Sequence, residues 1–229
     1  MEAIILAGGR GTRLKSVVAD LPKPMADIAG SPFLEILLRR LEKFGYSHVI
    51  LSLGYMAEKI ISYVEANQYS MKISFEVENK PLGTGGAIRR ALIKCNEDHV
   101  YIFNGDTFLD FDVNDTENFW DKEKCPVMVG HYLEDTSRYG RLIVEDGFVT
   151  GFIEKGKPNP GFINGGCYVI PLNYLDKWNL DENFSIENDH FAHSINQEKM
   201  GFIKSKSIFV DIGVPEDYFR AQKILREMR

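Results

Sequence analysis

The sequence predicts an α/β fold in which a mixed, mostly parallel sheet carries helices on both faces and an antiparallel part follows. In the first half, about residues 1–125, short apolar runs alternate with segments of helical spacing. Such alternation is typical of parallel βαβ units. From Val127 onward the runs become shorter and one hairpin signal separates two of them, which indicates antiparallel strands. A length of 229 residues fits one domain with a sizeable core.

Strands of the first half are expected at uninterrupted or alternating apolar runs, and helices where apolar residues recur every three or four positions. The expected strands are Ala3–Leu6, His48–Leu53, Ile73–Val77 and Val100–Phe103, and the expected helices are Phe33–Phe44, Met56–Ala66 and Ala87–Cys95. The first helix is followed by Gly45, a common stop signal. Ligands of parallel sheets bind outside the carboxyl ends of the strands, so motifs at those ends are candidate site residues.

The second half is expected to add antiparallel strands that form a lid over a second substrate. The predicted strands are Val127–His131, Arg141–Glu145, Phe148–Glu154 and Gly166–Ile170, and an amphipathic helix covers Pro215–Met228. Asp146-Gly147 lies between two of these strands and is a strong hairpin signal. We therefore divide the domain into a part at about 1–125 and a part at about 126–229.

Composition excludes several classes of partner. A net charge of −6 and a pI of about 5.5 argue against nucleic acids and anionic membranes. The three cysteines, Cys95, Cys125 and Cys167, are scattered and lack CxxC spacing, which predicts neither a disulfide framework nor a zinc site. There is no apolar run of membrane-spanning length and no signal-peptide pattern. We expect a cytoplasmic protein.

A glycine-rich loop follows the first predicted strand, in the segment Leu6-Ala7-Gly8-Gly9-Arg10-Gly11-Thr12-Arg13-Leu14. Without Cβ atoms the backbone can turn sharply and approach a ligand, and successive amides can form an anion-binding nest. The two arginines add permanent charge that suits phosphate oxygens. The segment lacks the Lys-Ser/Thr of a P-loop and the third small residue of a dinucleotide fingerprint. A phosphate-binding loop is the prediction, and a plain turn between strand and helix is the alternative.

Lys23 lies between Pro22 and Pro24, which are expected to hold the backbone rigid and extended. A lysine on a stiff segment near a phosphate loop can be aimed at a phosphoryl oxygen, and phosphoryl transfer needs positioning and charge neutralisation more than covalent chemistry. The alternative is a solvated surface lysine.

The glycine-rich loop followed by Leu21-Pro22-Lys23-Pro24-Met25 resembles the signature of the sugar-1-phosphate nucleotidylyltransferases. The resemblance implies a Rossmann-like (GT-A-like) fold and the reaction NTP + sugar 1-phosphate → NDP-sugar + pyrophosphate. It further implies two catalytic residues, with Lys23 on the α-phosphate and Arg13 on the leaving pyrophosphate. The nucleotide-binding residues that it implies in this loop are Leu6, Ala7, Gly8, Gly9, Gly11, Thr12 and Arg13.

A second glycine-rich turn, Pro81-Leu82-Gly83-Thr84-Gly85-Gly86, opens a predicted helix and resembles the family's base-binding turn, which implies nucleotide contacts from Pro81, Gly83 and Thr84. Glu78 stands three residues before Pro81, where resembling thymidylyl- and uridylyltransferases often carry Gln. An ionised carboxylate offers only acceptors, which suits the two adjacent donors of guanine. We therefore expect Glu78 to help select GTP. A solvent-facing strand residue is the alternative, and backbone groups of the two glycine turns could also select the base.

Asp106 follows the predicted strand Val100–Phe103, and a second carboxylate is available at Asp211. Hard divalent cations take oxygen ligands and bridge phosphates through one or two carboxylates. The family resemblance implies that this pair holds Mg²⁺ as the cofactor on the α-phosphate. The alternative for each is an N-cap at a strand end.

The resemblance also implies residues that bind the sugar 1-phosphate, here called the sugar-phosphate side. Their chemistry suits this substrate, since a carboxylate accepts from sugar hydroxyls and an ammonium pairs with phosphate. Its expected residues are Gly105, Tyr139, Gly140, Glu154, Lys155, Asn164, Gly165 and Glu187. An isolated Glu-Lys sequence is otherwise a common surface pair.

Two further patterns are set aside. Asp181-x-Asn183-x-Ser185 begins like an EF-hand, but Ile186 replaces the glycine and Ala192 the bidentate Glu. His190 and His193 have the spacing of metal ligands but are expected to serve packing and capping.

Within the family the chain is similar to the mannose- and heptose-1-phosphate guanylyltransferases, and its length favours D-glycero-α-D-manno-heptose 1-phosphate as the substrate. The expected partners are therefore GTP and this sugar 1-phosphate, with GDP-heptose as the product. A mannose-1-phosphate guanylyltransferase, a uridylyl- or cytidylyltransferase and a non-catalytic sugar-nucleotide sensor remain alternatives. The length leaves no room for the C-terminal left-handed β-helix of some family members, and a homodimer is compatible with the sequence.

Overall fold

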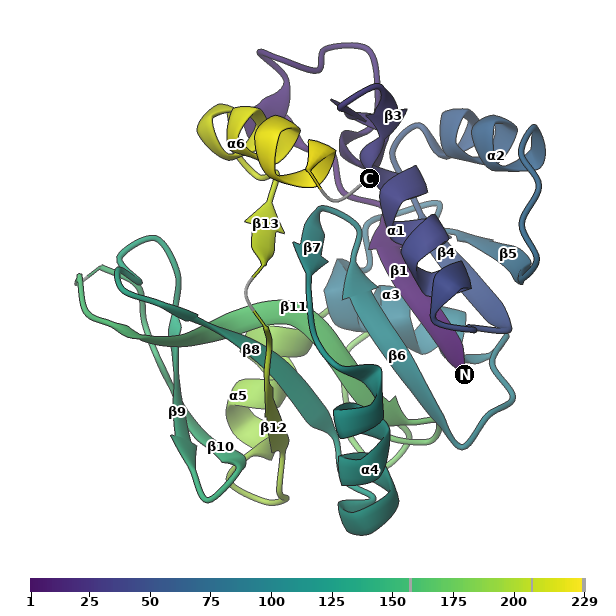
Figure 1. Ribbon diagram of the computed structural model, residues 1–229. Helices are drawn as coiled ribbons and strands as arrows, with labels where there is room; N and C mark the ends of the chain where they lie inside the picture. The colour runs from purple at the N-terminus through teal and green to yellow at the C-terminus, as the bar shows by residue number, and fades with distance from the viewer. Residues whose placement is uncertain (157, 207, 228–229) are drawn as a thin grey trace.

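A mixed nine-stranded sheet runs through the part of the chain that the computed structural model describes, residues 1–156, 158–206 and 208–227 (Figure 1). Its strands are β1 (Glu2–Ala7), β4 (His48–Leu53), β5 (Lys72–Val77), β6 (His99–Asn104), β8 (Val127–Leu133), β9 (Arg141–Glu145), β10 (Phe148–Ile153), β11 (Gly161–Pro171) and β12 (Gly201–Lys204). Their order is β5-β4-β1-β6-β11-β8-β12-β10-β9. All the strands predicted from apolar runs belong to this sheet.

Parallel pairing occupies one half of this sheet, and the other half is mainly antiparallel, although β12 pairs with β8 in parallel. β4 and β6 pair with β1 in parallel, and β5 extends the same parallel set. β11 then joins β6 and β8 in antiparallel fashion, and β9 and β10 form an antiparallel hairpin. The turn of this hairpin holds Asp146 at φ 49° and Gly147 at φ 81°, as expected for a tight turn with positive φ at both central residues. The predicted α/β class with an antiparallel part is confirmed.

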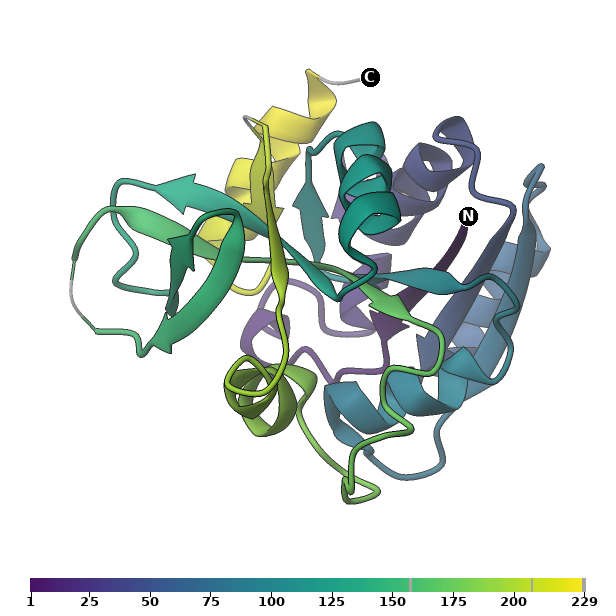
Figure 2. The same ribbon diagram turned by 90° about the horizontal axis from the view of Figure 1, so that it is seen from below.

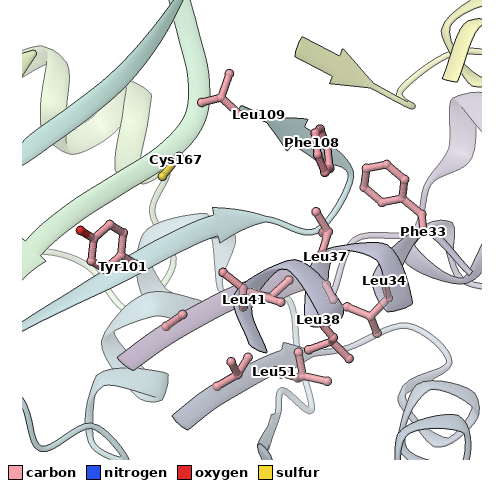
Figure 3. Packing of buried hydrophobic residues seen from close by; sticks show 14 of the residues in the cluster. Phe33, Leu34, Leu37, Leu38, Leu41, Leu51, Tyr101, Phe108, Leu109 and Cys167 are labelled. Carbon is pink, nitrogen blue, oxygen red and sulfur yellow. The ribbon is translucent and has the colours of Figure 1, made fainter. Parts of the chain in front are cut away.

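Helices cover both faces of the sheet, because successive side chains of a buried strand point to opposite sides. They are α1 (Phe33–Lys43), α2 (Ala57–Glu65), α3 (Gly83–Leu92), α4 (Val113–Glu123), α5 (Ala192–Ser194) and α6 (Pro215–Arg226). Side chains of α1, α2, α4 and α6 pack with Ile5 on one face, and those of α3 pack with Ile4 on the other. Figure 2 shows α3 and α5 on the opposite face from α1, α4 and α6. In Figure 3, Leu38 of α1 lies beside Leu51 of the sheet.

Four short elements carry most of the connections that position the site. They are the 3₁₀ turns η1 (Thr12–Leu14) and η2 (Lys23–Met25) and the strands β7 (Thr107–Leu109) and β13 (Phe209–Asp211). β7 and β13 form a separate antiparallel ribbon, which lies to the left of the parallel strands and below α6 in Figure 1. Another ribbon joins β2 (Asp27–Ile28) to β3 (Ser31–Pro32), and a π-helical segment, η3 (Ile186–Phe191), packs near α3.

Some boundaries differ from those predicted. α3 begins at Gly83 rather than Ala87, because the glycine-rich turn is itself the first turn of the helix. α4, β7, β12 and β13 were not predicted, since they are short or carry few apolar residues. The last helix ends at Arg226, and Met228 lies outside the described residues. None of the helices within the described ranges combines the length and hydropathy needed to cross a bilayer.

Candidate active site

A cleft of about 710 Å³ opens at the carboxyl ends of β1, β4, β5 and β6, where the parallel topology places ligand sites. Every predicted nucleotide-binding residue lines it. Three further lining residues are a predicted catalytic residue, a predicted metal ligand and a predicted substrate-binding residue. The nucleotide-binding residues are Leu6, Ala7, Gly8, Gly9, Gly11, Thr12, Arg13, Glu78, Pro81, Gly83 and Thr84, and the three others are Lys23, Asp106 and Gly105. Segments that are far apart in the sequence thus meet around one cavity large enough for a nucleotide.

The glycine-rich loop leaves β1 and passes directly over Lys23. Gly11 has a φ of +56°, and a Cβ at this position would stand 2.9 Å from the Cβ of Lys23. Glycine therefore meets two needs here, a left-handed backbone and close contact with the lysine stem. Pro22 is extended as expected, with φ −65° and ψ 146°, but Lys23 itself begins a 3₁₀ turn. Packing against Gly11, together with this turn, sets the direction of the lysine side chain.

Lys23 ends between two carboxylates. Its Nζ forms an ion pair with Asp106 and lies 4.0 Å from Oδ1 of Asp211. The lysine side chain is only 10% exposed, whereas the Asp106 and Asp211 side chains are 37% and 27% exposed. The ammonium group thus carries its charge in a partly desolvated setting, and both carboxylates keep a face open to a ligand.

The ribbon of β7 and β13 brings the two aspartates together. Asp211 pairs with Thr107, the residue after Asp106, and the amide of Ile212 donates to the carbonyl of Asp106 at 3.0 Å. Oδ1 of Asp211 also accepts from the amide of Gly213 at 2.6 Å. Burial, and next the negative charge of Asp106, raise the pKa of the Asp211 carboxyl. Two carboxylates held this close repel each other unless a cation lies between them.

The donor set of this aspartate pair suits a hard divalent cation. Among the described residues, no group of three or more His, Cys, Asp or Glu side chains is placed to hold a metal. A cation at Asp106 and Asp211 would therefore take its remaining ligands from water and substrate phosphates, which is how Mg²⁺ usually binds.

Glu78 stands just after the carboxyl end of β5, and its side chain is half-buried. Its Oε2 accepts from the amide of Leu82 at 3.2 Å. Its Oε1 would lie 3.0 Å from a Cβ at Gly8 and 2.7 Å from one at Gly54, so these two glycines make room for the carboxylate. Burial raises the pKa of Glu78. The side chain lines the cleft, and its role in selecting the base stays a prediction.

The second glycine-rich turn has two distinct roles. Gly83 and Thr84 line the cleft, whereas Gly85 faces away from it. A Cβ at Gly85 would stand 2.0 Å from Cε2 of Phe184, and the amide of Gly85 donates to the carbonyl of Phe184 at 2.9 Å. The second half of this motif therefore serves packing between α3 and the segment before η3.

Two residues expected on the sugar-phosphate side, Asn164 and Glu187, join the nucleotide turn through hydrogen bonds. Nδ2 of Asn164 donates to the hydroxyl of Tyr168 at 2.6 Å, and this hydroxyl donates to Oε1 of Glu187 at 3.0 Å. The other oxygen of Glu187, Oε2, accepts from the Thr84 hydroxyl at 2.8 Å. Tyr168 was not predicted as a site residue. It is fully buried, and its position in the apolar run Cys167–Ile170 concealed any polar role.

Asn164-Gly165-Gly166 forms a β-bulge. The register of β11 against β8 shifts between Asn164 and Cys167, and Gly166 has a φ of +70°. A Cβ at Gly166 would stand 2.8 Å from Nδ2 of Asn104, which lines the cleft. Bulges often redirect a side chain next to an active site, and this one brings the motif to the edge of the cleft.

The remaining sugar-side residues lie farther out. Tyr139 packs edge-on against Phe209 of β13, with ring centroids 5.8 Å apart, and a Cβ at Gly140 would stand 3.2 Å from the carbonyl of Ile153. Glu154 and Lys155 are exposed at the end of β10. None of these four is among the residues that line the cleft in the described part of the chain. Their roles stay predictions.

Arg10, predicted as part of the phosphate loop, also lines the cleft, and the lining residues not predicted are Pro24, Ser52, Gly54, Tyr55, Asn79, Lys80, Ala87, Asn104 and Gly213. Those at residues 52–55 lie at the end of a predicted strand of the parallel set or directly after it, so the strand-end rule could have found them. Of the patterns set aside, His190 is buried and packs against Trp178 with ring centroids 4.8 Å apart. Burial lowers its pKa to about 4. The three cysteines are free thiols.

Comparison with known proteins gives the same family as the motifs. The model of the nucleotidyl transferase family matches residues 2–228. The D-glycero-alpha-D-manno-heptose 1-phosphate guanylyltransferase of Aneurinibacillus thermoaerophilus is 42% identical over 99% of both chains. The enzyme of the same name from Campylobacter jejuni is 40% identical over 96% of this chain and 97% of its own.

Solved structures agree with this result. The crystal structure of HddC from Yersinia pseudotuberculosis complexed with GMP-PN superposes with a TM-score of 0.86 at 37% identity, over 98% of this chain and 99% of that one. The motifs, the cleft and the matches over nearly the whole length lead to one conclusion: the chain belongs to the nucleotidyl transferase family.

Proposed function

We propose that this protein transfers a guanylyl group from GTP to D-glycero-α-D-manno-heptose 1-phosphate, giving GDP-heptose and pyrophosphate. The observation that carries the proposal is the meeting of Lys23 and Asp106 beside the glycine-rich loop, in a cleft that Glu78 also lines, with Asp211 within 4.0 Å of the Lys23 ammonium. Similarity to two heptose 1-phosphate guanylyltransferases over nearly their full lengths supports the choice of substrates.

The reaction is an in-line displacement at phosphorus. A phosphate oxygen of the sugar 1-phosphate forms a bond to the α-phosphorus of GTP, and the bond between this phosphorus and the bridging oxygen to the β-phosphate breaks. The electron pair leaves with pyrophosphate, so no nucleophile from the protein is needed. Charge grows on the α-phosphate oxygens and on the leaving group, and catalysis consists mainly of positioning and electrostatic stabilisation.

Lys23 and the loop supply that stabilisation. The stem of Lys23 packs against Gly11, and its ammonium lies beside two carboxylates that line or adjoin the phosphate end of the cleft, so it is placed to meet an α-phosphate oxygen. Arg13 lines the cleft on the η1 turn and would meet the pyrophosphate. The amides of residues 8–11, whose loop lines the cleft, would hold the phosphates as an anion nest.

Asp106 and Asp211 would hold Mg²⁺. Bound there, the ion would neutralise phosphate charge and orient the α-phosphate. Lys23 now partly balances these two carboxylates.

Glu78 would recognise guanine through its two acceptor oxygens. On the sugar side, Asn164 and Glu187 are the best-placed candidates, because both are half-buried and linked to the cleft by hydrogen bonds. Contacts from Gly105, Gly165, Tyr139 and Gly140 stay part of the proposal, as do contacts from the exposed Glu154 and Lys155.

The second candidate function is mannose-1-phosphate guanylyltransferase. The enzyme of that name from Mycobacterium tuberculosis is 31% identical, and this chain covers 63% of its length. Lower identity and partial coverage make it the weaker candidate.

The free thiols favour a reducing compartment, so we retain the cytoplasm as the expected location, and a homodimer stays a prediction.

The test is pyrophosphate release from the purified protein with Mg²⁺, using GTP, ATP, UTP, CTP and dTTP against the 1-phosphates of heptose, mannose and glucose. We expect the highest kcat/KM with GTP and heptose 1-phosphate. A preference for mannose 1-phosphate would select the second candidate, and a preference for UTP or CTP would refute the guanylyl assignment. Nucleotide binding without pyrophosphate release from any pair would indicate a sensor.

A further inference from the structure

A buried tyrosine connects the two sides of the candidate site. Tyr168 lies in β11 with its side chain fully buried, and its hydroxyl contacts Asn164 at 2.6 Å and Glu187 at 3.0 Å. Glu187 continues the chain of hydrogen bonds to Thr84, which lines the nucleotide cleft. The path therefore runs from the β11 bulge through η3 to the first turn of α3.

The direction of each hydrogen bond in this path is fixed by chemistry. The Glu187 carboxylate accepts only, so the single proton of the Tyr168 hydroxyl must point toward it. The phenol oxygen can then only accept from Asn164, and this sets which end of the amide faces Tyr168. The other end, Oδ1, accepts from the amide of Gly166 at 2.8 Å. The Tyr168 hydroxyl and the Gly166 amide thus hold the two ends of the Asn164 amide in one orientation.

Burial keeps this proton in place. Burial raises the pKa of Tyr168 well above its usual value, and the nearby charge of Glu187 raises it further. The phenol therefore stays a donor at any working pH. The Thr84 hydroxyl accepts from the amide of Ile186 at 2.8 Å and donates to Glu187. Like the Tyr168 hydroxyl, it therefore has one donor and one acceptor as partners.

Asn164 and Glu187 themselves are half-buried and keep a face toward solvent. Ser185 holds the backbone of η3 in place, because its hydroxyl accepts from the amide of Asn188 at 3.1 Å and its own amide donates to Asp189 at 2.7 Å. Glu187 therefore projects from a capped segment, with its carboxylate oriented by the hydroxyls of Tyr168, Thr84 and Ser185. A half-buried acceptor and a half-buried amide held in fixed orientations suit the hydroxyls of a sugar.

We propose that Tyr168 is a positioning residue for the sugar 1-phosphate: its buried hydroxyl orients Asn164 and Glu187 together, and through Glu187 it ties the sugar side to the nucleotide turn. This inference rests on the proposed nucleotidyl transfer. It adds a residue that would touch neither substrate and that acts only through its two neighbours.

Tyr168→Phe tests the role, since it keeps the ring and its packing and removes only the hydroxyl. We expect KM for the sugar 1-phosphate to rise about 10- to 100-fold, as for the loss of hydrogen bonds to a charged group. The Kd for GTP alone should change less than about 3-fold, because the nucleotide residues stay in place. The assay uses the nucleotide and sugar 1-phosphate that wild type turns over fastest, so an error in the heptose assignment does not affect it.

Tyr101→Phe is the matched control. Tyr101 is also fully buried in a central strand and donates to a glutamate, Glu117, at 2.5 Å, but it packs on the other face of the sheet. Both variants should lose similar stability in thermal unfolding, whereas only Tyr168→Phe should raise KM for the sugar. Equal KM values in the two variants, or an equal loss of GTP affinity and sugar affinity in Tyr168→Phe, would refute the positioning role.

A second comparison tests the path itself. If Tyr168 acts through Glu187, then Tyr168→Phe added to Glu187→Ala should raise KM for the sugar by much less than it does in wild type. A full rise in both backgrounds would overturn the proposal. Calorimetric titration with the sugar-nucleotide product should rank wild type and the variants by Kd in the same order as by KM for the sugar, independently of turnover.

Discussion

Replacing Glu78 by Gln should change which nucleotide the protein prefers. The amide of Leu82 donates to Oε2 of Glu78 at 3.2 Å. In the variant this amide needs an acceptor, so the carbonyl oxygen of Gln occupies that position and the NH₂ group replaces Oε1. The space beside Gly8 and Gly54 that Oε1 fills would then hold a donor. A donor at this point opposes the N1–H and 2-amino groups of guanine and suits a carbonyl oxygen of uracil.

The magnitude follows from the loss of one charge-assisted hydrogen bond. Such a bond contributes about 1.5–3 kcal/mol, which corresponds to about 10- to 100-fold in kcat/KM for GTP. Because UTP would gain rather than lose a partner, the GTP/UTP ratio should fall by at least the same factor. The measurement is kcat/KM for both nucleotides in wild type and Glu78→Gln, with a saturating sugar 1-phosphate.

Acid should mimic the substitution. Burial raises the pKa of Glu78, so its carboxylate takes up a proton at a higher pH than an ordinary glutamate does. A protonated carboxyl presents a donor, and the GTP/UTP ratio of wild type should therefore fall as the pH is lowered toward this raised pKa. Glu78→Gln should show no such pH dependence of the ratio. An unchanged GTP/UTP ratio in the variant, or a wild type that prefers UTP, would refute the reasoning.

Four further substitutions test the phosphate end of the site and the packing behind the second glycine-rich turn. Lys23→Ala should lower kcat by about 10²–10³ with little change in the Kd for GTP, because charge on the α-phosphate grows in the transition state; single-turnover rates and equilibrium titration measure the two quantities. Asp106→Asn and Asp211→Asn should each keep the fold and lose most turnover at every Mg²⁺ concentration, since each removes one of only two carboxylates placed to bind the ion. Gly85→Ala should destabilise the fold by about 1–3 kcal/mol in thermal unfolding, because its Cβ would stand 2.0 Å from an aromatic ring.

Each of these outcomes has a contrary result. A rise in KM alone would show that Lys23 only binds substrate. A near-normal rate of either asparagine variant at saturating Mg²⁺ would contradict the two-carboxylate site. For the glycine, Gly9→Ala is the control, because a Cβ there meets nothing within 4 Å and stability should change by less than about 0.5 kcal/mol. Equal melting temperatures for the two alanine variants would mean that the packing argument at Gly85 is wrong.

The sequence alone determined the parallel half of the fold and the phosphate end of the cleft. Both depend on local patterns: buried strands are continuous apolar runs, and the glycines that turn the chain after β1 stand next to each other in sequence. The parallel order then places all strand ends on one edge, so residues 6–13 and 78–84 had to meet. For this reason the predicted nucleotide-binding residues all line the cleft.

Only the tertiary structure decided how Asp211 reaches Asp106. Asp106 directly precedes β7 and Asp211 ends β13. Each of these strands has only three residues, and such short runs do not stand out from a hydropathy pattern. The two strands are about 100 residues apart in the sequence, so no local sequence pattern predicts that they pair. Family resemblance supplied the pair, and the register of the ribbon supplied the physical reason.

The role of Tyr168 was likewise beyond the sequence. Its neighbours in the chain are apolar, and its polar partners come from the β11 bulge and from η3. A hydrogen bond between distant segments leaves no trace in periodicity, because the chain positions of its partners are set by topology rather than by spacing. Local patterns therefore determined which glycine-rich segments line the cleft, and long-range packing decided which polar side chains are held together beside it.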